Sequence, residues 1–150
     1  MSLYYDFFTA AFLAKITDYD LPKIPEDGRT GIVDGYMMRT LADFRDVCSI
    51  DFLGAANNET RQFDGIDIDE ALAFEIQDIV ADGMVCQWLR PYLYHQELLQ
   101  LSLNTKDWST YSSANLLSSV NTVYKDARRN YINRCREYSY RHGDLTDLHI

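Results

Sequence analysis

The sequence has few chain breakers and no long apolar run. Its 150 residues include only 7 glycines and 3 prolines, too few for a sandwich of many short strands joined by tight turns. No stretch approaches the roughly 18 consecutive apolar residues that a membrane-spanning helix needs. The apolar segment before residue 14 contains Asp6 and follows no basic residue, unlike a secretory signal peptide. These absences favour a helical protein with no membrane partner.

Cysteine and histidine are scarce, with three residues of each. Cys48, Cys86 and Cys135 lack the Cys-x-x-Cys spacing of a zinc ribbon, so we expect reduced core thiols. No zinc-protease, nucleophile-elbow or phosphate-loop motif occurs. The acids between Asp64 and Glu70 are out of register for an EF-hand calcium loop and instead favour a helix N-terminus. We therefore expect no catalytic residue, no metal and no cofactor.

Basic residues are also few, and they are unevenly placed. The chain has 14 Lys and Arg against 23 Asp and Glu, a net charge of −9. Residues 125–141 nevertheless carry +4, whereas residues 51–82 carry −8. Either the two regions neutralise each other within one fold, or they meet between subunits of an assembly. A basic helix in an acidic chain is also a candidate nucleic-acid surface.

Apolar residues recur at helical spacing through most of the chain, as Tyr4, Phe8, Phe12 and Ile16 do in the first segment. We expect helices at about residues 2–16, 30–48, 69–90, 94–103 and 111–141. The connector at 49–64 is expected to be irregular, with a short helical turn at 50–55. The predicted fold class is all-α, a helical bundle of about four to five helices with a long C-terminal helix and extended connectors. One helical domain covers 1–150, including a short C-terminal tail at 144–150.

The predicted boundaries depend on caps and breakers. Asp67 followed by Glu70 has the spacing of an acidic capping box and predicts the start of the third helix. Pro91 is expected to end this helix, and Gly143 is expected to end the last one. Gly83 in the middle of the third helix costs roughly 1 kcal/mol relative to Ala, so we expect another helix to pack closely against it.

The tail at 144–150 contains Leu145, Leu148 and Ile150. Terminal segments fray unless something covers them, so we expect these side chains to dock on a partner; the alternative is that the tail folds back on its own core. The predicted inter-subunit or partner contacts are Arg128, Arg129, Arg134, Arg136, Leu145, Leu148 and Ile150.

Several stretches are similar to a known family. They are residues 102–115 (SLNTKDWSTYSSAN), residues 138–145 (YSYRHGDL), and Gly83-Met84-Val85 followed by Trp88-Leu89. Over about residues 65–145 the chain resembles small virion proteins of tailed bacteriophages, the head–tail connector or neck adaptor proteins. The resemblance implies a helical, non-enzymatic subunit of a homo-oligomeric ring under the portal protein.

The same resemblance implies the partners and the location. These are the portal protein, a tail or stopper protein, and DNA that passes through the channel without specific binding, in a virion assembled in the host cytoplasm. The 11 tyrosines suit extensive interfaces, and a ring requires two different complementary faces. The alternative is a small cytoplasmic helical regulator that binds protein or nucleic acid through the basic helix at 125–141.

Overall fold

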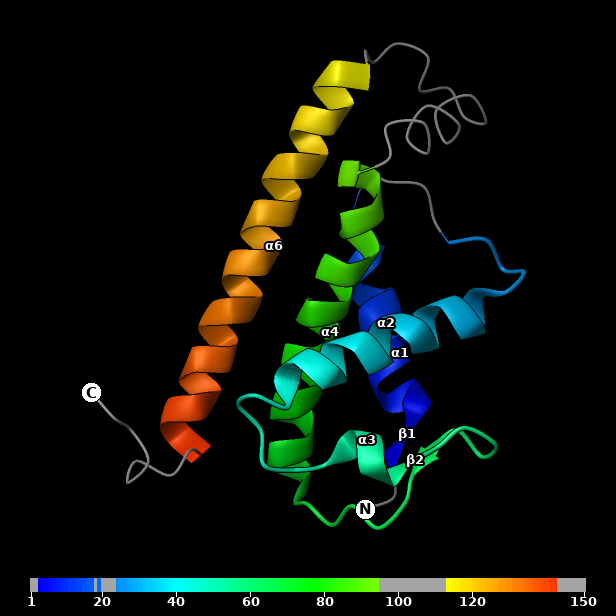
Figure 1. The fold of residues 1–150 in the computed structure, drawn as a ribbon, viewed down its shortest axis with the longest axis vertical. Helices are drawn as coiled ribbons and strands as arrows, with labels where there is room; N and C mark the ends of the chain where they lie inside the picture. The colour runs from blue at the N-terminus through cyan, green and yellow to red at the C-terminus, as the bar shows by residue number, and fades with distance from the viewer. Residues whose placement is uncertain (1–2, 18, 20–23, 95–112, 143–150) are drawn as a thin grey trace.

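The computed structural model describes residues 3–17, 19, 24–94 and 113–142. Most of these residues are helical, which confirms the all-α class and the long C-terminal helix (Figure 1). In chain order the elements are β1 (Leu3–Tyr4), α1 (Tyr5–Ile16), α2 (Arg29–Phe44), α3 (Phe52–Ala55), β2 (Ala56–Asn57), β3 (Gln62–Phe63), α4 (Glu70–Tyr94) and α6 (Ser113–His142). The helix predicted at 94–103 and the tail at 144–150 lie outside the described residues.

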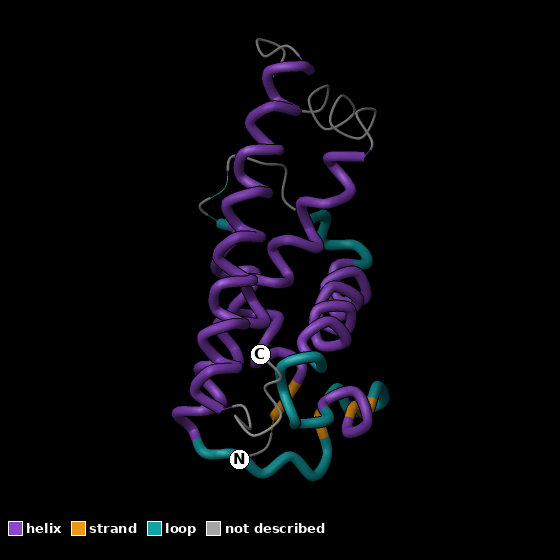
Figure 2. Tube along the Cα trace, turned by 60° about the vertical axis from the view of Figure 1, so that its left-hand side comes forward, coloured by secondary structure: helices purple, strands orange, loops and turns teal. Residues whose placement is uncertain are grey.

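Helix α4 is the centre of the bundle and packs against α1, α2 and α6. Helices α4 and α6 lie side by side and antiparallel, and α2 crosses α4 (Figures 1 and 2). None of the helices in the described part of the chain is long and apolar enough to cross a membrane.

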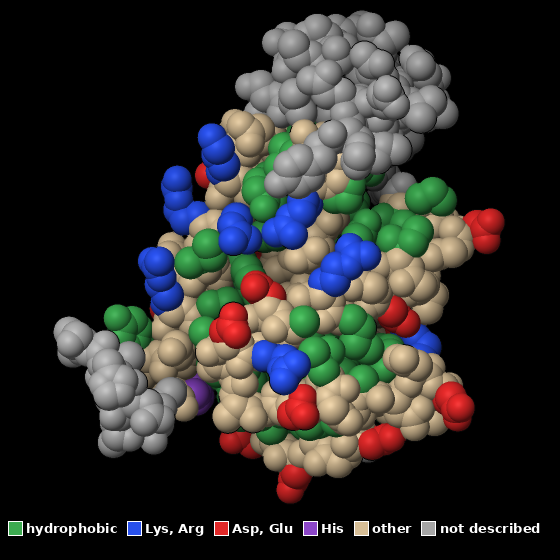
Figure 3. Space-filling model, viewed as in Figure 1, with side chains coloured by type: hydrophobic (Ala, Val, Ile, Leu, Met, Phe, Trp, Pro, Cys, Tyr) green, Lys and Arg blue, Asp and Glu red, His purple; other side chains and the backbone are tan. Residues whose placement is uncertain are grey.

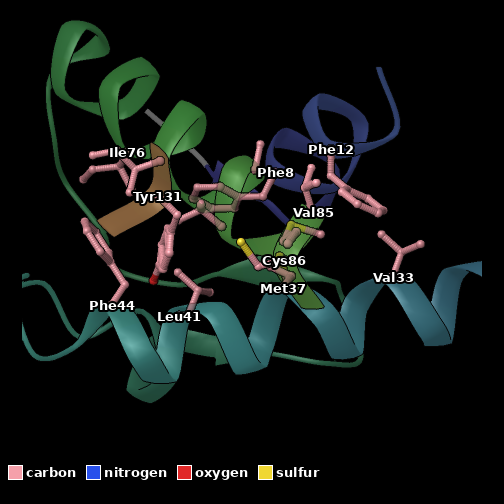
Figure 4. Close-up of a cluster of buried hydrophobic side chains, with 14 of the residues drawn as sticks. Phe8, Phe12, Val33, Met37, Leu41, Phe44, Ile76, Val85, Cys86 and Tyr131 are labelled. Atoms are coloured by element: carbon pink, nitrogen blue, oxygen red, sulfur yellow. The ribbon is translucent and has the colours of Figure 1, made fainter. Parts of the chain in front are cut away.

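The core follows the helical periodicity of the sequence. One face of α2 is buried, and its apolar side chains are Val33, Met37, Leu41 and Phe44. These side chains meet Phe8 and Phe12 of α1 and residues of α4 and α6 in one continuous cluster (Figure 4). Tyr4, expected in the buried stripe of α1, is 51% exposed, and Tyr5 is buried in its place.

The predicted close approach at Gly83 is confirmed. A Cβ atom at this position would lie 2.4 Å from Cγ2 of Thr40 on α2 and 2.8 Å from Cε1 of Tyr131 on α6. Real Cβ atoms do not approach other atoms so closely. The missing side chain therefore lets three helices meet at one point.

The 49–64 connector is more ordered than the sequence predicts. The short helical turn is present as α3, and the Asp51 side chain caps it by accepting a hydrogen bond of 2.9 Å from the Gly54 N–H. After it, β2 and β3 form a hairpin, and β1 adds a third antiparallel strand through Leu3 opposite Phe63. The connector is thereby attached to the start of α1.

Helix α4 starts within one residue of its predicted start, but its cap residue and its end differ from the prediction. The cap is Asp69 rather than Asp67, because its carboxylate accepts a 2.7 Å hydrogen bond from the Leu72 N–H. At the other end the helix continues through Pro91 to Tyr94. Proline removes a single backbone donor, and the edge-to-face contact between Trp88 and Tyr92, with ring centroids 6.3 Å apart, supports the final turn.

Candidate interaction surface

One face of α6 is the seam that joins this helix to the body, and its buried residues are Val120, Ala127, Tyr131 and Tyr138. The Tyr131 hydroxyl donates a 2.9 Å hydrogen bond to Asp43 of α2. The Tyr138 ring packs on Phe44 with centroids 5.2 Å apart, and its hydroxyl lies 3.5 Å from the Cys48 sulfur. Burial raises the pKa of both tyrosines, so each hydroxyl stays protonated and available as a donor.

Ion pairs flank this seam, and they neutralise carboxylates of α4. Arg134 contacts both Asp78 and Asp82, with 3.0 Å between its Nε and the Asp82 Oδ2. Lys15 of α1 reaches the same two carboxylates at 2.8 and 3.0 Å. Arg134, expected as a partner contact, is thus engaged within its own chain.

The end of α6 makes a second internal pairing. Arg141 lies 2.5 Å from Glu75 of α4, and His142 Nε2 lies 3.0 Å from the other carboxylate oxygen. Glu75 and Arg141 line a polar groove of about 700 Å³ between α4 and α6. Four acids line the groove against Arg134 and Arg141, so it keeps an excess of negative charge.

The opposite side of α6 has a different character. We call its exposed residues Lys125, Arg128, Arg129 and Arg136 the basic face. None of the four makes an ion pair with any residue that the structure describes. Between them lies a shallow groove of about 350 Å³, which the half-buried Tyr124 and Ile132 also line. In Figure 3 blue side chains gather over α6 and the upper half of the molecule.

Arg128 also borders a second groove, of about 470 Å³, where α2, α4 and α6 meet. Arg39 and Arg90 line it as well, opposite Asp43 and Asp46, so its charges are nearly balanced. Burial raises the pKa of the adjoining Cys86 thiol to about 11. That thiol is therefore protonated at neutral pH and is a poor nucleophile.

The hairpin and the start of α4 carry the opposite charge. We call the exposed acids Asp51, Glu59, Asp64, Asp67, Asp69 and Glu70 the acidic end. The sole base within 51–70 is Arg61, which pairs with Asp6 at 2.9 Å and with Asp34 at 2.8 Å. No acid of the acidic end has a cationic partner among the described residues. Figure 3 shows red side chains along the lower edge of the molecule.

The structure therefore separates the predicted contact residues. Arg128, Arg129 and Arg136 are exposed on α6, Arg134 is paired internally, and Leu145, Leu148 and Ile150 lie outside the described residues. Lys125 was counted in the predicted basic helix but not among the predicted contacts, although its spacing of four from Arg129 places both on one side of the helix.

The described residues of the basic face and the acidic end are distinguished by their charge. Within the described ranges no three His, Cys, Asp or Glu side chains are grouped so that they could hold a metal ion. The structure thus describes an all-α protein that carries one basic and one acidic surface. The chain has no significant match among protein-family models, curated proteins or solved structures.

Proposed function

We propose that this protein is a structural, non-enzymatic ring subunit in the neck of a tailed bacteriophage, where it joins the portal protein to a tail or stopper protein. The observation that carries the proposal is that one helical body has a basic face and an acidic end, and that neither forms an ion pair with the residues described by the structure. A closed ring is built from one heterologous contact repeated between copies, so each copy needs two different, complementary surfaces.

The sequence supports the same assignment. The resemblance over residues 65–145 is to neck adaptor proteins, and part of it, Gly83 to Leu89, falls on the tightly packed section of α4. The net charge of −9 suits a channel through which DNA passes, because like charges prevent adhesion. The proposed location is the virion, after assembly in the host cytoplasm.

Imaging of the concentrated protein tests this function. Under the proposal, negative-stain electron microscopy shows ring-shaped particles of one size, and sedimentation velocity shows a matching large species. High salt should shift that species towards the monomer, because a contact between exposed charges is screened. A protein that remains monomeric at every concentration in low salt would contradict the proposal, as would a gene with no portal or capsid genes beside it.

A second candidate is a cytoplasmic helical regulator that binds nucleic acid or a protein through the basic helix. The observation in its favour is the basic face itself, whose four cations surround Tyr124 and form no ion pair within the described ranges. Titration with short duplex DNA separates the two candidates. Tight binding that weakens steeply with salt, and that is lost when Arg128 and Arg129 are changed to Glu, would favour the regulator.

A further inference from the structure

We infer, on the basis of the proposed function, that the basic face of one copy docks on the acidic end of the next copy. The ring would then be built head to tail by a single charge-complementary contact. The partner of the basic face is accordingly a second copy of this chain, and its recognition site is the region formed by α3, the β2–β3 hairpin and the first turn of α4.

The basic face meets the physical requirements of a docking surface. Its four cations stand on the middle of a 30-residue helix that is anchored by buried tyrosines, so they are presented on a rigid support. Tyr124 and Ile132 provide apolar area between the cations. An apolar centre with a charged rim is the usual anatomy of a protein–protein interface.

The acidic end matches this surface in charge and in support. It offers six exposed carboxylates to the four cations of a neighbouring basic face. Local hydrogen bonds hold three of the carboxylates in place: Asp51 accepts from Gly54, Asp64 from the Asn57 side chain, and Asp69 from Leu72. Arg61 is occupied by Asp6 and Asp34, so it does not neutralise the acidic end.

One copy cannot satisfy both surfaces by itself. Glu75 pairs with Arg141 and His142, so the start of α4 lies beyond the end of α6. At a rise of 1.5 Å per residue, Arg136 is then roughly 15 Å from Glu70 along the helix axes alone. This separation exceeds ion-pair distance and also the Debye length of about 8 Å at physiological salt. Within the part of the chain that the structure describes, the two surfaces therefore do not neutralise each other.

A second copy fits the basic face better than DNA does. Any DNA bound there would lie beside a molecule whose net charge of −9 opposes the approach of phosphate. The acidic end is an attractive partner when it belongs to a neighbour. Because charge reversal tests complementarity directly, two triple variants are sufficient to decide the matter.

The first variant reverses the basic face, with Arg128→Glu, Arg129→Glu and Arg136→Glu. Like charges across the contact should weaken self-association about 100-fold or more. The control is Arg45→Glu, which reverses an exposed cation just after α2, outside the basic face. Each variant must retain the helical circular dichroism and melting temperature of the wild type.

The second variant reverses the acidic end, with Glu59→Lys, Asp67→Lys and Glu70→Lys, and it avoids the cap residue Asp69. It should also fail to self-associate. Its control reverses the exposed acids Glu26 and Asp27, which precede α2 and lie outside the acidic end. This control should assemble as the wild type does.

Two combinations should restore assembly. In an equimolar mixture of the two variants, every acidic surface can meet a basic one on the other protein, so alternating rings form. A single chain with all six changes has the net charge of the wild type and again has complementary surfaces. Both should recover association to within about tenfold of the wild type, measured by sedimentation velocity and imaging.

The possible results are distinguishable. Rescue in both combinations supports the inference. A wild type that assembles, with triple variants that assemble equally well or that are not rescued by mixing, overturns the inference and leaves the ring proposal standing. A wild type that never assembles overturns both. Duplex DNA that binds the wild type tightly, and competes with self-association for the same arginines, also overturns the choice of a second copy as the occupant.

Discussion

The two sides of α6 carry the same kinds of residue but have opposite roles. Arg134 and Arg136 are two positions apart, which places them roughly 200° apart around a helix with 3.6 residues per turn. Arg134 is held by Asp78 and Asp82, whereas Arg136 has no carboxylate partner among the described residues. Helix phase, and not the amount of positive charge, therefore decides which cations stabilise the fold and which remain available to a partner.

The inner side of α6 depends most strongly on Gly83. Replacement by Leu should place side-chain atoms where the buried Thr40 and Tyr131 side chains already lie. We expect Gly83→Leu to lower the free energy of unfolding by about 3 kcal/mol or more. Urea denaturation followed by circular dichroism measures this loss.

Gly35 provides the matched control, since it is also a helical glycine. A Cβ there would meet only the end of the Arg39 side chain, at an ordinary 3.9 Å. Gly35→Ala should therefore stabilise the protein by up to about 1 kcal/mol through helix propensity. A Gly83→Leu variant as stable as the wild type would mean that α6 does not pack on α4 at this point.

Alkaline pH should lower the free energy of unfolding, because the Cys86 thiol is buried in the same inner region. Burial raises the Cys86 pKa from 9.0 to about 11, so the folded state favours the neutral thiol. The resulting contribution to stability is complete below pH 9 and is lost as the pH rises through 11. For one thiol the loss reaches about 2 kcal/mol by pH 11.

The Cys86→Ala variant isolates this contribution. Between pH 9 and pH 11 its free energy of unfolding should fall less steeply than that of the wild type, although buried tyrosines give both proteins a residual slope in the same direction. Parallel slopes for the two proteins would show that the Cys86 thiol is accessible to water beside α6.

Local periodicity predicted which residues lie on the inner side of α6, but it did not predict the ion pairs that this side forms with other helices. The spacing of Tyr131 and Tyr138, and the need for close packing at Gly83, follow from the sequence by itself. Lys15, which shares Asp78 and Asp82 with Arg134, comes from α1 and is brought there only by the tertiary fold. Charge counting over residues 125–141 could not separate cations that are neutralised from those that are not.

The small sheet was missed for a related reason. Each strand of the hairpin has only two residues, too few for an alternating pattern to be recognised. The third strand comes from Leu3, about sixty positions away from Phe63. At Pro91 the local rule predicted a helix end, whereas the helix continues through it to Tyr94. The proposed docking of residues 144–150 stays a prediction.

A moderate effect is expected for the ion-pair network of the inner side. Arg134→Ala should lower the free energy of unfolding by about 1 kcal/mol, because it removes a partner from two carboxylates, while Lys15 still neutralises part of their charge. The loss should shrink at high salt, which screens half-exposed pairs. An effect that does not depend on salt would assign the role of Arg134 to packing of its hydrocarbon stem.

The smallest effect on folding is expected for Arg136→Ala, on the outer side. Exposed substitutions away from special contacts usually change stability by less than about 0.5 kcal/mol, and Ala is the better helix former. The melting temperature should thus stay level or rise slightly, whereas self-association should weaken. Arg134→Ala should show the reverse pattern, with reduced stability and intact association. If Arg136→Ala destabilised the monomer as much as Arg134→Ala does, the two sides of α6 would not differ in role, and the basic face would belong to the fold rather than to a partner.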